Sequence, residues 1–220
     1  MKISILCSDD KHPVFLWLKR WVSLQSKQSE VELVSALAQL SGGDILFLIS
    51  CHEIVKKDIR DIYKSTLVIH ASDLPIGRGW SPHIWQILEG KSDIIVSLLE
   101  ADDGVDQGRI WAKRMFHLEG HELYDEINAK LFDIELELMD FAVENFHHVE
   151  PSEQDGRKAT YYRKRSPNDS EIDLDKTIVE QFELLRISDP VRFPAFIIYR
   201  DHKYKISLEK MGKVDKEVQL

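Results

Sequence analysis

Short apolar runs that alternate with polar turns are the feature that most constrains the fold of this chain. Four such runs lie at 3–7, 45–49, 66–69 and 94–99. Runs this short, rich in Ile, Val and Leu, are typical of buried strands. Because segments with helical spacing separate them, the sequence predicts an α/β fold with a mostly parallel sheet flanked by helices.

The segments between and after these runs show the spacing of amphipathic helices. In the first of them, Val14, Leu18 and Trp21 recur at the interval that places them on one helix face. The predicted helices cover 14–22, 31–40, 56–63, 82–89, 121–146 and 175–186. A polar loop at 147–170 and a terminal hairpin at 195–199 and 203–208 complete the prediction. The loop divides the chain into a main domain at 1–150 and a short appendage at 151–220.

Composition places the chain among globular proteins that need no covalent cross-links. It has 220 residues, of which 43% are hydrophobic, and only two cysteines, Cys7 and Cys51. Both lie in or beside apolar runs, so we expect free thiols in a reducing compartment. The N-terminus does not resemble a signal peptide, and no run approaches the ~20 apolar residues of a membrane helix. These features predict a cytoplasmic protein with no membrane partner.

The formal net charge of −9 argues against a broad nucleic-acid surface, because phosphate contacts need clustered Lys and Arg. The basic residues at 157–158 and 163–165 are most simply interpreted as a solvated loop. The pair His121-Glu122 does not begin a zinc-binding HExxH motif, because Asp125 stands where the second His is required. We therefore expect no nucleic-acid partner and no metal.

Polar loops follow each of the four apolar runs, and two of these loops carry His70 and Asp106. In open α/β sheets, ligands bind beyond the carboxyl ends of the strands, where we expect all four loops to emerge. One imidazole and one carboxylate can share the work of proton transfer. The chain has nine histidines and 38 acidic residues, so these residues alone leave a purely structural His70 as the commoner alternative.

Ordered motifs surround these two residues. The strand end with His70 is followed by Ser72-Asp73-Leu74-Pro75 and Arg78-Gly79, and a helix and a strand later comes Asp103-Gly104-Val105-Asp106. This arrangement resembles the central signature of the folate-dependent formyltransferases, which include methionyl-tRNA formyltransferase, glycinamide ribonucleotide formyltransferase and the sugar N-formyltransferases. Ala159-Thr160-Tyr161 and later segments are similar to the linker of the tRNA and sugar enzymes. The resemblance therefore covers nearly the whole chain.

The resemblance implies a Rossmann-like formyltransferase fold, with 1–150 as the catalytic domain and 151–220 as linker, short helix and β-hairpin. It makes His70 and Asp106 the catalytic pair and 10-formyltetrahydrofolate the formyl donor, with no metal. The family's pterin-binding loops correspond to Cys51, His52, Glu53, Ile54, Ala101, Asp102 and Val105.

One departure from the family concerns Val68, which stands where the family usually has an Asn that donates a hydrogen bond to the oxyanion. A valine side chain cannot donate, and losing one such donor costs about 100- to 1,000-fold in rate in other enzymes. Either His70 and another group such as Thr66 or Ser72 compensate, or the enzyme is slow or altered.

The predicted acceptor is a nucleotide-linked amino sugar of the 4-amino-4,6-dideoxyhexose type, used for lipopolysaccharide or another surface polysaccharide. A purine-pathway enzyme would need a glycine-rich phosphate loop after the first strand, and a methionyl-tRNA enzyme would need a further RNA-binding domain. The residues expected to line the acceptor site are Asp10, Lys11, His12, Ser72, Arg78 and Trp80. Among them, a guanidinium could bind a diphosphate and an indole could stack on a base or sugar.

Several alternatives stay open from the sequence. They are formyl transfer to another small amine or to methionyl-tRNA, hydrolysis of the donor, and a folate-binding relative without transferase activity. A homodimer is open as well.

Overall fold

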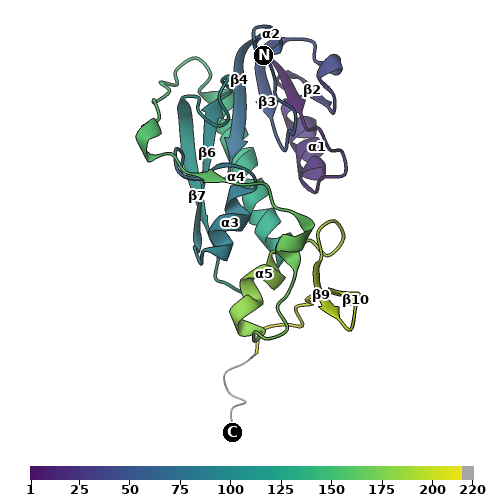
Figure 1. Ribbon diagram of the computed structural model, residues 1–220. Coiled ribbons are helices and arrows are strands. Elements are labelled where there is room, and N and C mark those ends of the chain that lie inside the picture. The colour runs from purple at the N-terminus through teal and green to yellow at the C-terminus, as the bar shows by residue number, and fades with distance from the viewer. Residues whose placement is uncertain (215–220) are drawn as a thin grey trace.

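The computed structural model describes residues 1–214, and its centre is a six-stranded sheet in the order β2-β1-β3-β4-β6-β7 (Figure 1). The strands are β1 (Lys2–Leu6), β2 (Glu30–Val34), β3 (Gly43–Leu48), β4 (Tyr63–His70), β6 (Asp93–Glu100) and β7 (Ile110–His117). The first four run parallel, whereas β6 pairs antiparallel with both β4 and β7. The predicted α/β fold with a mostly parallel sheet is confirmed.

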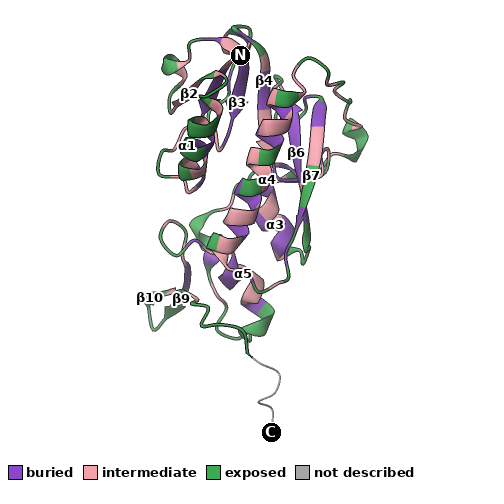
Figure 2. Ribbon diagram, turned by 180° about the vertical axis from the view of Figure 1, so that it is seen from behind, coloured by how far each residue is buried: buried purple, intermediate pink, exposed green. Residues whose placement is uncertain are grey.

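Two helices, α1 (Val14–Gln25) and α4 (Tyr124–Glu144), lie side by side over one face of the sheet (Figure 2). Trp21 of α1 packs edge-on against Phe47 of β3, so the apolar stripe of α1 faces the sheet. The Trp21 indole also donates a hydrogen bond of 2.7 Å to the Asp140 carboxylate of α4. Burial of these apolar stripes against the sheet forms the main core.

The segment predicted as a helix at 31–40 is instead the edge strand β2, followed by a 3-10 turn at Leu37–Gln39. Here the apolar residues Val31 and Leu33 alternate with glutamates, which is the period of a strand. The Ser4 hydroxyl of β1 also donates to the Glu32 carboxylate at 2.6 Å. The helix predicted at 56–63 is reduced to α2 (Lys57–Arg60), because its last residue already belongs to β4.

The antiparallel direction of β6 changes where the loop after it begins. Its last residue, Glu100, pairs with Leu67 in the middle of β4, and the Ala101 amide donates to the Thr66 carbonyl. The loop after Leu99 therefore starts beside Thr66 in the middle of β4 rather than at the His70 end, and the prediction that it emerges beside the other three loops was wrong. This loop reaches the His70 end only by folding back along β4.

The C-terminal part pairs with the loop after β4 through a short parallel ladder between β5 (Arg78–Gly79) and β8 (Tyr161–Tyr162), which is separate from the main sheet. Further 3-10 turns lie at Gly156–Lys158 and Pro167–Ser170. The helix predicted at 175–186 is divided into a 3-10 turn (Val179–Gln181) and α5 (Phe182–Arg186), which lies against α3 (Pro82–Leu88). The predicted hairpin is confirmed as β9 (Ala195–Tyr199) and β10 (His202–Ile206).

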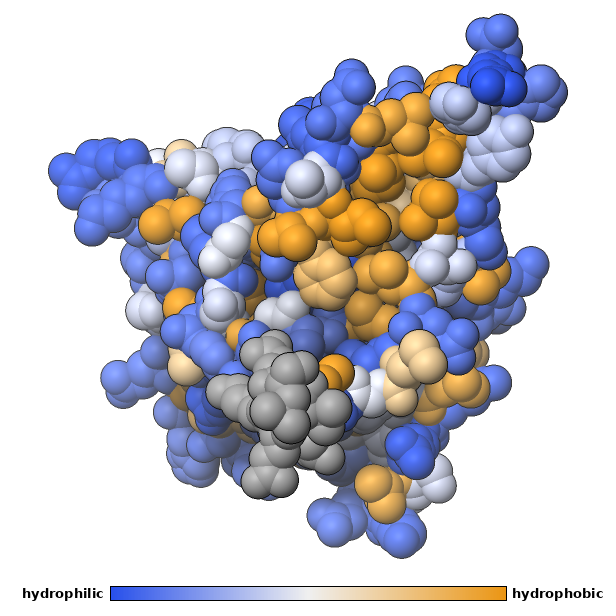
Figure 3. All heavy atoms as spheres, turned by 90° about the horizontal axis from the view of Figure 1, so that it is seen from below, coloured by the Kyte–Doolittle hydropathy of each residue, from blue (hydrophilic) through white to orange (hydrophobic). Residues whose placement is uncertain are grey.

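Apolar side chains gather on the end of the molecule that carries α5 and the hairpin (Figure 3). Among the exposed apolar residues of this region are Val191, Phe193 and Ile198. Within residues 1–214, none of the helices has both the length and the apolar character required to cross a bilayer.

Glu135 on α4 is a carboxyl group without a partner in the described part of the chain. Its Oε2 atom is buried and makes no hydrogen bond, and burial raises the pKa of the carboxyl from 4.5 to about 8. An acid whose pKa is higher in the folded than in the unfolded chain takes up a proton on folding between these two pH values. Its contribution to stability is therefore lost as the pH rises from 4.5 to about 8.

We expect Glu135→Gln to raise the free energy of unfolding above pH 8 by about 1 to 3 kcal/mol, because a neutral amide removes the buried charge. The gain should shrink at about pH 5, where the folded wild-type chain holds the carboxyl protonated. Thermal unfolding across this pH range measures the difference. Glu137→Gln, on the exposed face of the same helix, is the control. A gain that is equal at both pH values would contradict this account of Glu135.

Candidate active site

His70 lies at the end of β4 with only 7% of its surface exposed, and both of its ring nitrogens face oxygen atoms. Nε2 lies 2.8 Å from the Gly77 carbonyl, and Nδ1 lies 3.5 Å from Oδ1 of Asp106. A carbonyl oxygen can only accept, so Nε2 carries a hydrogen and Nδ1 is the nitrogen that faces the carboxylate. The structure thus brings together the two residues that the sequence predicts as a catalytic pair.

The loop holds Asp106 in a backbone conformation that residues other than glycine rarely adopt, with φ at 54°. Its Oδ2 accepts a hydrogen bond of 2.8 Å from the Gly79 amide. The Asp106 carboxylate therefore contacts both His70 and the loop that follows His70 in the sequence. Two residues later the chain passes so close to β6 that a Cβ on Gly108 would lie 1.9 Å from the Glu100 carbonyl oxygen. Only glycine fits at residue 108, and the loop that carries Asp106 therefore ends packed against the last residue of β6.

Arg78 is placed differently from its prediction as a ligand of a diphosphate. The residue is 5% exposed, and its guanidinium donates to the Tyr161 hydroxyl at 3.1 Å and to Oε1 of Gln154 at 2.7 Å. These bonds within the protein leave Arg78 buried rather than at the mouth of a substrate site. Ser72 is also buried, and its hydroxyl has no hydrogen-bond partner among the described residues.

Trp80 lies half-exposed at the edge of the site, where three loops meet. Its indole stacks on the His52 imidazole with centroids 5.8 Å apart, and the Lys164 amino group lies 4.5 Å from its ring. The His52 amide donates to the Ser8 hydroxyl at 2.8 Å. The structure therefore brings His52, predicted for the donor, beside Trp80, predicted for the acceptor.

The sequence neighbours of His52 that are also predicted to bind the donor are Cys51, Glu53 and Ile54. Glu53 and Ile54 are exposed. The Cys51 thiol donates to the Glu53 carbonyl at 3.4 Å, and burial raises its pKa. A thiol with a raised pKa is a poor nucleophile, which agrees with a structural role.

The loop after β1 contributes exposed Asp10 and Lys11, whereas His12 is directed into the protein. Its Nδ1 accepts a hydrogen bond of 3.3 Å from the Val14 amide at the start of α1, and burial lowers its pKa to about 4. A neutral His12 that caps the helix fits a structural role better than the predicted binding of a charged acceptor. Sequence reasoning missed Asp9, which pairs with Arg192 at 2.5 Å.

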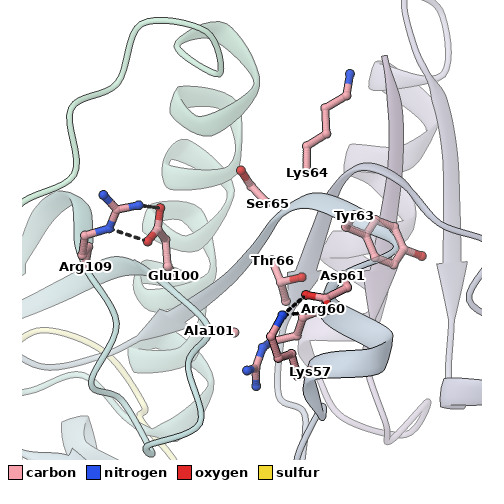
Figure 4. A pocket seen from close by; sticks show the side chains of 10 residues that line it. All are labelled: Lys57, Arg60, Asp61, Tyr63, Lys64, Ser65, Thr66, Glu100, Ala101 and Arg109. Carbon is pink, nitrogen blue, oxygen red and sulfur yellow. Dashed lines mark hydrogen bonds and ion pairs between the residues drawn. The ribbon is translucent and has the colours of Figure 1, made fainter.

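A cavity of about 320 Å³ opens at the start of β4, between α2 and the loop after β6 (Figure 4). It is lined by Lys57, Arg60, Asp61, Tyr63, Lys64, Ser65, Thr66, Glu100, Ala101 and Arg109. The four cationic side chains are paired with carboxylates, which leaves little net charge in the walls. The Thr66 hydroxyl is buried and has no hydrogen-bond partner among residues 1–214. Such a hydroxyl can bind a polar group of a ligand.

Of the predicted donor-binding residues after β6, Ala101 lines this cavity, and it also lines an adjoining one of about 300 Å³ together with Asp102. Val105 is exposed on the same loop and is not part of either lining. Gln154 carried no signal as a site residue, because it does not lie in a motif with a recognisable spacing. In the described part of the chain, no group of three or more His, Cys, Asp or Glu residues could hold a metal ion.

Comparison with known proteins identifies relatives along most of the chain. It is 26% identical to a methionyl-tRNA formyltransferase of Caldicellulosiruptor saccharolyticus over 176 residues, which are 78% of this chain and 55% of the relative. A methionyl-tRNA formyltransferase of Rickettsia africae is 29% identical over 80% of this chain and 57% of its own length. The chain thus spans about half the length of these relatives.

Solved structures show the same fold. A methionyl-tRNA formyltransferase from Clostridium thermocellum superposes with a TM-score of 0.82 at 24% identity, over 96% of this chain and 94% of the other. A Mycobacterium tuberculosis protein described as a likely sugar N-formyltransferase gives a TM-score of 0.75 at 20% identity, over 97% and 99% of the two chains. HypX from Aquifex aeolicus in complex with tetrahydrofolic acid gives 0.75 at 18% identity, over 94% of this chain and 37% of HypX.

The family model described as formyl transferase matches residues 5–143, which is more than half of the chain and contains both His70 and Asp106. With this match, the chain belongs to the formyl transferase family.

Proposed function

We propose that the chain transfers the formyl group of 10-formyltetrahydrofolate to the primary amine of a small acceptor, with His70 and Asp106 as the catalytic pair. The observation that carries the proposal is the buried contact of 3.5 Å between Nδ1 of His70 and Oδ1 of Asp106. A buried imidazole and carboxylate at the meeting point of several loops can move a proton between reacting groups.

In the reaction, a bond forms between the acceptor nitrogen and the formyl carbon, and the bond from that carbon to the folate nitrogen breaks. The acceptor nitrogen must lose a proton, and the departing folate nitrogen must gain one. Asp106 and His70 supply a route for the proton from the acceptor nitrogen to the folate nitrogen. Oδ1 of Asp106 and Nδ1 of His70 face each other, and each can accept a proton and return it.

Val68 supplies no oxyanion donor, but two buried hydroxyls in this part of the structure are free to bind a ligand or reacting group. Thr66 and Ser72 are both buried, and neither hydroxyl has a hydrogen-bond partner among the described residues. An unpaired buried hydroxyl costs about 1 to 3 kcal/mol in the free protein, which a ligand or reacting group could recover by accepting its hydrogen. Ser72, two residues after His70, is the candidate for the missing donor, whereas Thr66 lies four residues before His70 on β4 and is assigned to the pterin.

The donor fits the cavity at the start of β4. Thr66 and His70 project from the same face of β4, about 13 Å apart at the usual rise of a strand. A flat pterin in the cavity would meet the apolar Ala101 and the free Thr66 hydroxyl, and its formyl-bearing side would extend toward His70. The fold shared with HypX in complex with tetrahydrofolic acid is consistent with a folate donor.

The proposed acceptor is a nucleotide-linked amino sugar. Trp80 offers a half-exposed indole beside the Lys164 ammonium, a combination that suits a stacked base or sugar and a phosphate. Lys164 thus replaces the buried Arg78 in the predicted phosphate contact. The fold shared with a likely sugar N-formyltransferase over nearly all of both chains supports the same acceptor class. Methionyl-tRNA is the second candidate, because the relatives with curated names are methionyl-tRNA formyltransferases.

We expect His70→Ala and Asp106→Asn each to lower kcat by at least about 100-fold, because proton transfer in the transition state depends on them. Donor binding should persist in both variants, as shown by an increase in melting temperature on adding 5-formyltetrahydrofolate. Asp103→Asn is the control, because this exposed carboxylate of the same loop contacts Arg60 rather than His70. Wild-type turnover in either variant would exclude the proposed pair.

Thr66→Val should weaken donor binding about 5- to 10-fold, because it removes one hydrogen bond to the ligand while keeping the side-chain shape. The melting temperature measured over a range of 5-formyltetrahydrofolate concentrations gives the affinity of each variant. Thr177→Val, the same substitution at an exposed threonine outside the cavity lining, should leave that affinity unchanged. If Thr66→Val binds the analogue as tightly as the wild type, the pterin does not contact this hydroxyl.

The acceptor is tested by incubating the enzyme and donor with dTDP- and UDP-linked 4-amino sugars, the matching 3-amino sugars, glycinamide ribonucleotide and methionyl-tRNA. Mass spectrometry should detect a gain of one formyl group on a nucleotide-linked 4-amino sugar. Trp80→Ala should then raise KM for that sugar more than KM for the donor, because stacking is lost. Formylation of methionyl-tRNA alone would replace the sugar with the second candidate.

A further inference from the structure

The two groups that hold the His70 ring are themselves held by a distant part of the chain. The Gly77 carbonyl faces Nε2 of His70, and the Asp106 carboxylate faces Nδ1. Gly77 donates a hydrogen bond to a residue of the segment 154–162, and Asp106 accepts one from another residue of that segment. We call the segment 154–162 the linker brace. This segment lies beyond α4, more than forty residues from Asp106 along the sequence.

On the Asp106 side, the contact is made by the side-chain amide of Gln154. Its Nε2 donates to the Asp106 carbonyl at 2.9 Å and to the Gly108 carbonyl at 2.7 Å. A primary amide has two hydrogens, so both are used on the backbone of one turn. Asp106 has a positive φ, and such a conformation persists only where the surrounding structure fixes it. Gln154 is the side chain that fixes this turn.

Gln154 is oriented in turn by Arg78, whose guanidinium donates to its Oε1 at 2.7 Å. The same guanidinium donates to the hydroxyl of Tyr161, the first residue of β8. Arg78 is 5% exposed, and a hydrogen bond from a charged donor is about twice as strong as a neutral one. The buried charge therefore fixes which end of the Gln154 amide faces Asp106.

On the Gly77 side, the contact is made by Thr160. Its hydroxyl accepts a hydrogen bond of 2.8 Å from the Gly77 amide, and its carbonyl accepts one of 2.9 Å from the Arg78 amide. Gly77 has a φ of 76°, and a Cβ there would lie 2.9 Å from the Tyr162 ring. The linker brace thus sets the position of the peptide whose carbonyl meets His70.

We propose that the linker brace positions the catalytic pair, with Gln154 and Thr160 as positioning residues that act through Asp106 and Gly77. Neither residue touches the reacting atoms. Loss of either bond lets one side of the His70 ring shift while the fold stays intact. For its effect on turnover the proposal rests on the proposed formyl transfer, but its effect on the His70 ring is independent of that activity.

The first test is Gln154→Glu, which keeps an acceptor for Arg78 and removes both donors to the Asp106 turn. We expect kcat to fall about 10- to 100-fold, the usual cost of a displacement of about 1 Å at a catalytic group. KM for the donor should stay within about twofold, because the cavity at Thr66 is untouched. Glu153→Ala, at the exposed neighbouring residue, is the control and should leave kcat unchanged.

Gln154→Ala covers the case in which Gln154→Glu does not fold, because it introduces no buried charge. Melting temperature and circular dichroism establish that each variant is folded. A folded Gln154→Ala or Gln154→Glu variant with wild-type kcat would overturn the proposal on the Asp106 side.

The second test compares Thr160→Val with Thr160→Ser. Valine removes the hydroxyl that Gly77 uses and keeps the size and the backbone bonds, whereas serine retains the hydroxyl. We expect Thr160→Val to lower kcat and Thr160→Ser to restore it to within about twofold of wild type. A loss of equal size in both variants would show that Thr160 acts only through packing.

The third test needs no turnover. In protein with 15N-labelled histidine, the ring signals of His70 are identified by their loss in His70→Asn. We expect both ring nitrogens of His70 to shift in Gln154→Glu and Thr160→Val but not in Glu153→Ala. If the wild type formylates no acceptor and these shifts still occur, the proposed function fails and the brace stands. Unchanged His70 signals in both variants would exclude the brace.

Discussion

The hydrogen bonding of β4 to neighbours of opposite direction is the constraint on which the rest of the site depends. On one side it pairs parallel with β3, and on the other it pairs antiparallel with β6. The parallel side places His70 at the edge where ligands of open α/β sheets bind. The antiparallel side makes the chain after β6 start near Thr66 and run back along the strand to His70. One strand therefore carries the cavity proposed for the donor near its start and the proposed catalytic pair at its end.

The sequence predicted most of this sheet, because runs such as 45–49 and 94–99 are too short and too rich in branched residues to be helices. It failed at 31–40, where two apolar residues alternate with glutamates on an edge strand that is only half buried. It also failed on the direction of β6, because the apolar pattern of a strand does not show whether the strand pairs parallel or antiparallel with its neighbour. Pairing with neighbouring strands determines both the strand at 31–40 and the direction of β6, and local residue propensities do not predict this pairing.

The candidate site shows the same division. His70 and Asp106 could be found, because they lie in ordered motifs that resemble a known family, and the structure brings them together. Arg78 lies in the same motifs, but sequence alone could not distinguish a guanidinium that meets a ligand from one that meets Gln154. Gln154 itself lies in a polar stretch with no pattern, and only the folded chain reveals its two bonds to the Asp106 turn.

The ladder between β5 and β8 has a consequence for how the chain could be divided. The family match ends at residue 143, and the polar stretch after it has the composition of an exchangeable connector. Yet Gln154, Thr160 and Tyr161, all beyond residue 150, make hydrogen bonds with Asp106, Gly77 and Arg78. A division that keeps His70 and Asp106 with these bonds would therefore fall after residue 162, and one that also keeps Lys164 beside Trp80 would fall after residue 164. Segments beyond residue 164 could diverge or be recombined between relatives without removing these bonds, whereas a junction at residue 150 would separate the proposed catalytic pair from its support.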